Sequence, residues 1–129
     1  MKLVKDVMVR DIITITPFAT IREALSLMKR HSVKSLVVER QNEHDAWGLI
    51  TYTNILKSVI SEDGDIDLLN VYDVCAKPVI SVGENLALKY AARLMTEYRV
   101  KRLLVLCDND ISGFVVMDDI MQALLDTVD

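Results

Sequence analysis

The most constraining feature of the chain is an internal duplication. Residues 4–43 align without a gap with residues 71–110, a shift of 67 positions (71 − 4), and the closing segment realigns at a shift of 65 (113 − 48) after a two-residue deletion. At 129 residues the chain has the size of one compact domain, and a unit of about 60 residues is marginal alone. We therefore expect the two halves to share one core.

Composition excludes several classes of protein. The chain is 51% apolar but only 5% aromatic, so its core is expected to be aliphatic. Nineteen acidic against fifteen basic residues give a net charge of −4, which argues against nucleic-acid binding. The start lacks an apolar signal core, and no run approaches the roughly 18 apolar residues of a membrane span. We expect a cytoplasmic protein without nucleic-acid or membrane partners.

Cysteine and histidine do not indicate catalysis or metal binding. Cys75 and Cys107 stand alone without C-x-x-C spacing, so buried free thiols are expected rather than a disulfide or a zinc site. His31 and His44 have no neighbouring ligands or nucleophile. With no glycine-rich phosphate loop either, the sequence predicts no enzyme, no catalytic residue, no metal and no catalytic cofactor.

Periodicity predicts the same order of elements in each half: strand, helix, strand, strand, helix. The first helix starts at a Thr20–Glu23 capping box and runs to about His31, and Thr53 is expected to cap the second helix. The expected strands of the first half are 12–16, 35–39 and 46–51, and the corresponding elements of the second half are 79–82, 85–98, 102–107, 111–116 and 118–127.

Domain boundaries follow from the repeat. Repeat one is assigned to residues 1–62, an acidic linker to residues 63–70, and repeat two to residues 71–129.

One heptapeptide pattern, which starts with glycine, occurs at the same point of both halves, where a strand leads into a helix. It reads GLITYTN at residues 48–54 and GFVVMDD at residues 113–119. This pattern resembles the CBS (cystathionine β-synthase) domain, whose repeats carry Gly, two aliphatics, Thr or Ser, two variable residues and Asp. Residues 4–8, VKDVM, match the "V-x-D-h-M" opening of that family, where h is aliphatic. The resemblance covers nearly the whole chain.

The resemblance implies a tandem CBS pair, or Bateman module. Its fold class is α/β (α+β), with two pseudo-symmetric β-α-β-β-α repeats packed as one compact module. Clefts on either side of the sheets in that family commonly bind adenosine-containing ligands such as AMP, ADP, ATP or S-adenosylmethionine. The family supplies regulation of a partner protein and no catalysis.

Each half departs from the family motif at a different position. Repeat one keeps the hydroxyl as Thr51 but has Asn54 where Asp is usual, whereas repeat two keeps Asp119 but has Val116 where Thr or Ser is usual. An acid or amide at a helix start can bind both hydroxyls of a ribose, and a hydroxyl three residues earlier can meet a phosphate. Asn54 lacks the charge that strengthens such bonds.

Basic residues favour the second site. Family sites often place cations just before the second strand, where repeat two has Lys101 and Arg102 and repeat one has Lys34 and a serine. We therefore rank the Asp119 site first, with Arg102 and Lys101 as phosphate contacts and Lys34 approaching from the other repeat. The Thr51 and Asn54 site ranks second.

Each of these residues also has a structural interpretation. Asp118, and alternatively Asp119, could cap the last helix, Thr51 suits a strand end, and Lys101 and Arg102 could be solvated charges.

The closing helix of each repeat has more apolar surface than a monomer can bury. We expect a homodimer through helices containing Ile55, Leu56 and Val59 in one repeat and Ile120 and Leu124 in the other.

Two functions fit the sequence. The first is a stand-alone sensor in which an adenosine-containing nucleotide bound between the repeats modulates an unknown partner protein. The second is a ligand-independent interaction module that acts through its helical faces, because each motif has lost one polar anchor.

Overall fold

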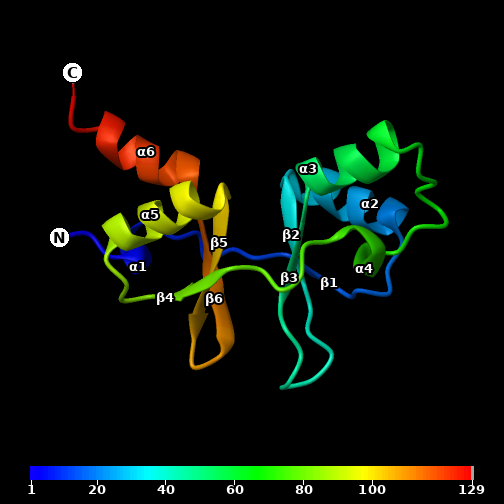
Figure 1. Cartoon of the computed structure of the whole chain (residues 1–129), viewed down its shortest axis with the longest axis horizontal. Coiled ribbons are helices and arrows are strands. Elements are labelled where there is room, and N and C mark those ends of the chain that lie inside the picture. Colours follow the sequence, from blue (N-terminus) through cyan, green and yellow to red (C-terminus); the bar gives the residue numbers. More distant parts are fainter. Residues whose placement is uncertain (129) are drawn as a thin grey trace. The chain divides into compact units, whose positions relative to one another are not determined.

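The computed structural model describes residues 1–128, so Asp129 of the predicted second repeat lies outside the described residues. Figure 1 shows the elements. In the first half they are α1 (Val4–Val7), β1 (Thr14–Ile15), α2 (Ile21–His31), β2 (Ser35–Val38), β3 (Gly48–Thr51), α3 (Tyr52–Ile55) and the π-helix η1 (Leu56–Ser61). In the second half they are α4 (Val71–Val74), β4 (Ser81–Gly83), α5 (Leu88–Tyr98), β5 (Arg102–Cys107), β6 (Asp110–Val116) and α6 (Met117–Leu125).

The predicted order of elements and the mixed fold class are confirmed. The first helix ends at His31 as expected, and its Thr20–Glu23 capping box is present. Each half also opens with one helical turn, α1 or α4, which the periodicity did not predict.

The compact units of the structure are not the sequence repeats. One unit joins residues 1–12 to the chain from Ile80 onward, and the other comprises residues 13–79. We call residues 1–12 and 71–79 the opening segments, because each begins one repeat. Each unit therefore combines the opening segment of one repeat with the strands and long helix of the other.

The unit of residues 13–79 holds a three-stranded sheet in the order β1-β2-β3. β1 runs parallel to β2, and β3 is antiparallel to it, with Ser35 opposite Thr51. Its core consists of buried aliphatic and small side chains from the sheet, the segment before α2, α2, α3 and the opening segment, namely Ile15, Ala19, Ile21, Ala24, Met28, Leu36, Val38, Ile50, Ile55, Val71 and Val74.

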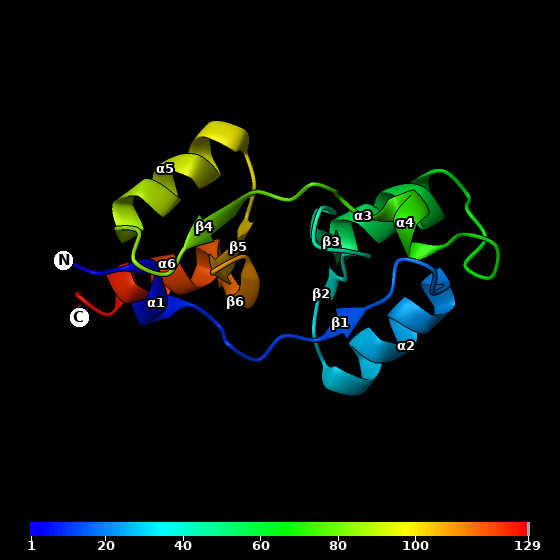
Figure 2. The ribbon, with the colours of Figure 1, turned by 90° about the horizontal axis from the view of Figure 1, so that it is seen from below.

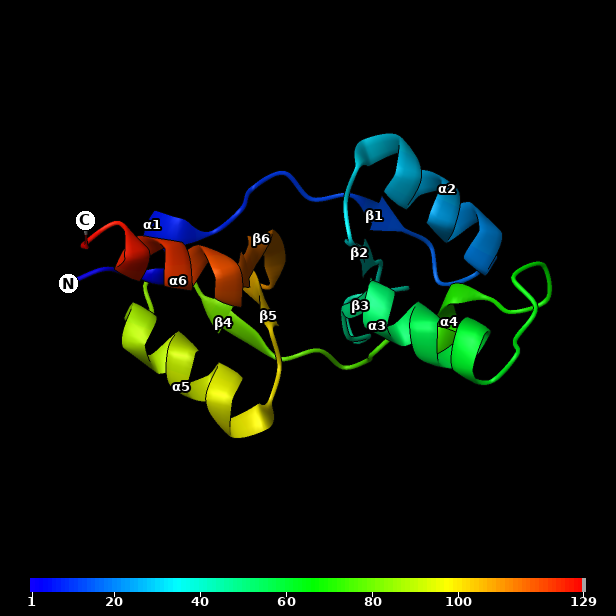
Figure 3. The same cartoon turned by 90° about the horizontal axis from the view of Figure 1, so that it is seen from above.

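The unit that contains residue 80 onward repeats this sheet as β4-β5-β6, with Arg102 opposite Val116. The helices α5 and α6 lie side by side (Figure 3), and α1 lies beside α6 (Figure 2). Asp108 and Asn109 have φ of 52° and 68°, which is typical of a two-residue hairpin turn. The two-residue deletion of the duplication falls between Asp110 and Gly113, directly after this tight turn.

The opening segments make the same backbone bonds in both units. Val4 N–H donates to Leu86 O (2.9 Å), and Val71 N–H donates to Ala19 O (2.8 Å) at the positions equivalent by the shift of 67 (71 − 4 and 86 − 19). Further along, Val9 bridges to Phe114 of β6, as Ala76 bridges to Leu49 of β3. The duplication therefore extends to how each opening segment docks.

The predicted acidic linker at 63–70 packs against α2. Arg22 N–H donates to Ile66 O and Ile21 N–H donates to Leu69 O, each at 3.0 Å. Ile66 and Leu69 pack against the core of this unit.

Two expectations about single residues are wrong. Thr53 lies inside α3, and Thr51 is the residue that caps this helix, because β3 runs directly into it. Cys107 is exposed at the end of β5, whereas Cys75 is half-buried and its burial raises the pKa of its thiol. Among the residues that the structure describes, no helix is long and apolar enough to cross a membrane.

Candidate functional site

The start of α6 brings together the predicted residues of the second repeat. Met117 N–H donates to Lys101 O at 2.9 Å, and Arg102 lies opposite Val116 in the β5–β6 ladder. Asp119 is the third residue of α6. Lys101 and Arg102 therefore lie at the end of the sheet where α6, which carries Asp119, begins.

The polar groups of this cluster have few partners within the chain. Val116 provides no side-chain cap for α6, and across residues 1–128 no hydrogen bond or ion pair engages the half-buried Asp119 carboxylate. The Nε of Arg102 is buried and has no hydrogen-bond partner among residues 1–128. A buried donor left unsatisfied costs about 1–3 kcal/mol, and an anion placed here would satisfy it.

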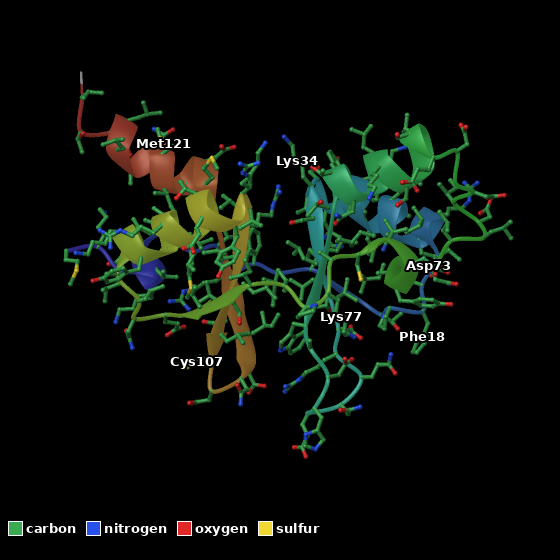
Figure 4. The ribbon with its side chains drawn as sticks, in the orientation of Figure 1. Phe18, Lys34, Asp73, Lys77, Cys107 and Met121 are labelled. Atoms are coloured by element: carbon green, nitrogen blue, oxygen red, sulfur yellow. The ribbon has the colours of Figure 1, made fainter. Side chains whose placement is uncertain are left out.

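The start of α3 brings together the predicted residues of the first repeat. Tyr52 N–H donates to Lys34 O at 3.2 Å, and Ser35 pairs with Thr51. Figure 4 shows Lys34 beside the start of α3. The exposed Lys34 therefore lies next to Thr51 and Asn54 of its own unit, and its predicted approach to Asp119 remains a prediction.

Thr51 and Asn54 are engaged with each other. Thr51 N–H donates to Asn54 Oδ1 at 2.9 Å, and Asn54 N–H donates to Thr51 Oγ1 at 3.3 Å, which is a reciprocal capping box. The Thr51 hydroxyl also lies 3.1 Å from Asn54 Oδ1. A ligand at this site would have to displace these bonds, so the two helix starts are chemically unequal.

The glycines of the heptapeptide make room for the opening segments. A Cβ on Gly113 would overlap the Val9 carbonyl oxygen, and a Cβ on Gly48 would lie 3.1 Å from Ala76 O. The two glycines at equivalent positions were the only sequence signal of this close approach. Their role is to seat the opening segment against β6 and β3, which shapes the strand end that carries the site.

A further polar cluster was not predicted from the sequence. Ser112 Oγ donates to a Glu84 carboxylate oxygen, and Arg10 lies 3.6 Å from the same carboxylate. The hydrogen bond from Ser112 and then the charge of Arg10 hold the pKa of Glu84 below its usual value. No periodicity signals this cluster, because it joins an opening segment to β6 and to the turn after β4.

Metal ligands do not gather in the described chain. Across residues 1–128 no group of three or more His, Cys, Asp or Glu side chains is placed to hold a metal ion.

A model of the CBS domain matches residues 4–61 and again residues 71–126. The chain belongs to the CBS domain family. Both copies of the heptapeptide and both opening helical turns lie inside the matched residues. The predicted tandem CBS pair is therefore confirmed.

Sequence relatives match this chain over very different shares of their own length. The chain is 32% identical to an uncharacterized protein of Methanopyrus kandleri over 88% of this chain and 58% of that protein. It is 31% identical to a CBS domain-containing protein of Bacillus subtilis over 93% of this chain and 84% of that protein. The inosine-5'-monophosphate dehydrogenase of Methanocaldococcus jannaschii matches at 32% identity, but over only 23% of that enzyme. No catalytic domain is thus shown for this chain.

Solved structures share the fold. A hexameric CBS-CP12 protein from bloom-forming cyanobacteria superposes with a TM-score of 0.90 at 31% identity, over 93% of this chain and 66% of that one. A CBS pair solved in complex with methylthioadenosine and S-adenosylmethionine superposes with a TM-score of 0.81 at 24% identity, over 98% of each chain.

The expectation of a homodimer is contradicted, because the CBS-CP12 relatives are hexameric. The expected dimer face is also partly wrong. Ile55 belongs to the core of its unit, and Val59 and Ile120 pack against the two cores, whereas Leu56 and Leu124 are each 59% exposed. Helical periodicity alone did not separate core from surface positions on these short helices.

Proposed function

We propose that this CBS-domain protein is a regulatory sensor that binds an adenosine-containing nucleotide at the start of α6. AMP, ADP, ATP and S-adenosylmethionine are the candidate ligands, and nucleotide binding changes the protein's affinity for a partner protein. Asp119 accepts hydrogen bonds from the ribose hydroxyls, and Arg102 with Lys101 contacts the phosphate of AMP, ADP or ATP, or the carboxylate of S-adenosylmethionine.

The observation that carries this proposal is that, among the described residues, neither the buried Arg102 Nε nor the carboxylate of Asp119 at the start of α6 has a partner. Both groups gain hydrogen bonds when a nucleotide binds, so binding is favoured there over the self-capped Thr51 and Asn54 site. The complex of a CBS pair with S-adenosylmethionine supports an adenosyl ligand for this fold.

Calorimetry on ligand-free protein tests the site. We expect one of the four nucleotides to bind and to raise the free energy of unfolding by about 2.7 kcal/mol at a hundredfold excess over Kd. Asp119→Asn should weaken binding tenfold or more, because the charge-assisted bonds to the ribose are lost. Asp118→Asn is the matched control, since Asp118 is the exposed neighbour on the same helical turn.

A ligand-independent interaction module is the second candidate. It is favoured by the self-capped Thr51–Asn54 pair and by the exposed apolar side chains Leu56, Ile60 and Leu124. Absence of binding by all four nucleotides, together with partner capture that survives the double change Asp119→Ala and Arg102→Ala, would establish this function instead.

A further inference from the structure

A second site lies in the unit of residues 13–79, away from the start of any closing helix. It is a hollow of about 470 Å³ between the edge strand β1 and one face of α2. β1 and α2 lie side by side in Figures 2 and 3. The α2 residues that line it are Glu23, Ser26, Leu27 and Arg30, which recur at i, i+3, i+4 and i+7 of one helical face.

The hollow has an apolar floor. Ile15 and Ala19 line it and are only 4% and 5% exposed, and the half-buried Leu27 continues the floor along α2. A small aliphatic group placed here would lose contact with water on one side.

Opposite charges border this floor. Arg30 comes from α2 and Glu39 directly follows β2, and both are in the lining. Within residues 1–128 no ion pair joins either of them to another side chain. Glu23, by contrast, is already engaged, because its carboxylate accepts the Thr20 N–H at 3.3 Å. The free cation and the free anion of the hollow are therefore Arg30 and Glu39.

Uncharged hydrogen-bonding groups complete the rim. Val37 N–H donates to Ile13 O and Glu39 N–H donates to Ile15 O, so the main-chain groups of Thr14 between them face the unpaired edge of β1. The Thr14 side chain is exposed and lines the hollow.

The other repeat provides an internal comparison. The positions of Glu23 and Ser26 hold Tyr90 and Arg93 there, and the Arg93 guanidinium lies 5.4 Å from the centre of the Tyr90 ring. Arg30 corresponds to Glu97 and Glu39 corresponds to Leu106, by the shift of 67 (97 − 30 and 106 − 39). The second repeat therefore has neither the pair of opposite charges nor the small side chain at these positions.

We propose that this hollow binds a small zwitterion with the chemistry of an aliphatic α-amino acid. Arg30 binds the carboxylate, Glu39 binds the ammonium group, and the aliphatic side chain packs on Ile15 and Ala19. This site shares no residue with the proposed nucleotide site, because its lining belongs to the unit of residues 13–79 and Asp119 to the other unit.

Titration of the isotope-labelled full chain by NMR, with L-leucine as the probe, tests this proposal. We expect saturable amide shifts confined to residues 14–19, 23–30 and 39. Two analogues with the same branched chain isolate the charges: 4-methylpentanoate lacks the ammonium group, and 3-methylbutan-1-amine lacks the carboxylate. Each should bind at least tenfold more weakly than leucine, because one charge-assisted contact is lost.

Matched variants distinguish the hollow from nonspecific binding. Arg30→Glu introduces the residue of the second repeat and should abolish the shifts, whereas Lys29→Glu changes the same charge on the neighbouring exposed residue and should leave them intact. Ser26→Arg should also abolish them by filling the hollow. Dispersed amide spectra confirm folding of each variant. The proposal is overturned if leucine gives no saturable shifts, if the analogues bind equally, or if Lys29→Glu and Arg30→Glu behave alike.

Discussion

At Gly113 the opening segment passes so close to β6 that a side chain has no room. The obstructing atoms are the Val9 carbonyl group and the Arg10 Cα, which are backbone and not the flexible end of a side chain. At Gly48 the tightest contacts are 3.1 Å to Ala76 O and 3.2 Å to Val38 Cβ, so a small adjustment could accept a methyl group. The two equivalent glycines are therefore under different steric demands.

We predict that Gly113→Ala destabilises the protein more than Gly48→Ala. Gly113→Ala should lower the free energy of unfolding by about 1–3 kcal/mol, because the opening segment must move away from β6. Gly83→Ala is the control, since beyond its chain neighbours no described residue lies within 4 Å of a Cβ there. Denaturant unfolding of the three variants measures the order, and equal stability of Gly113→Ala and Gly83→Ala would contradict it.

Glu84 should contribute to the acid stability of the fold. Its pKa in the folded state lies below that of the unfolded chain because Ser112 donates to its carboxylate and Arg10 lies nearby. Its stabilisation is therefore fully present above the unfolded pKa of about 4.3 and is lost as the pH falls through the folded pKa. The loss of stability is therefore expected on the acid side of about pH 4.3.

Glu84→Gln should reduce this loss of stability at acid pH when the free energy of unfolding is measured across the pH range. Glu97→Gln, an exposed glutamate of α5, is the control and should keep the slope of the parent protein. An unchanged slope in Glu84→Gln would show that the interaction with Ser112 does not depend on charge.

At the scale of elements, α3 and α6 occupy equivalent places but begin differently. Thr51 caps α3 in a reciprocal box with Asn54, whereas α6 begins after Val116 without a side-chain cap. Because α6 has Val116 where α3 has Thr51, no hydroxyl at this position caps α6 or engages Asp119. The start of α3 is thus stabilised by its cap, whereas the start of α6 keeps a carboxylate that can bind a ligand.

Placing the residue of the other repeat at each cap position should change the free energy of unfolding in opposite directions. Thr51→Val is expected to cost about 1 kcal/mol, because Asn54 N–H loses its acceptor. Val116→Thr should add a cap to α6 and recover stability of similar size. Denaturant unfolding measures both variants, and a change in the same direction for both would contradict the interpretation.

At the scale of the whole molecule, the exchanged opening segments make each compact unit depend on both sequence repeats. Val71 is fully buried in the core of the unit of residues 13–79, and Ala76 bonds to Leu49 of β3. A fragment that ends before these residues would lose part of its core and the bridge at the edge of β3.

We predict that a fragment of residues 13–79 folds, whereas a fragment of residues 1–62 does not. The first contains the complete core of its unit, and the second lacks Val71 and Val74. Amide dispersion in NMR spectra and cooperative thermal unfolding measure the difference. Val71→Asp in the fragment of residues 13–79 is the control and should unfold it, because a charge would then be buried. A folded 1–62 fragment would contradict the role assigned to residues 71–79.

The order of elements and the CBS family could be predicted from the sequence, because they depend on periodicity, on capping residues and on a motif that occurs twice. The assignment of Asp119, Arg102 and Lys101 to a ligand stays a prediction. Local patterns do not record which segments pack together, so the docking of α1 and α4, the partners of Gly113 and the Glu84 cluster were missed. The burial of Ile55 and the exposure of Cys107 were mispredicted for the same reason.

The sequence by itself determined that the chain is a duplicated CBS pair and that its two motifs differ at Thr51, Asn54, Val116 and Asp119. Only the tertiary structure decided what those differences do. Thr51 and Asn54 satisfy each other, whereas no group within residues 1–128 satisfies the Asp119 carboxylate or the buried Nε of Arg102. The physical reason is that a polar group is available to a ligand only when no nearer group of the folded chain satisfies it, and nearness is a property of the fold.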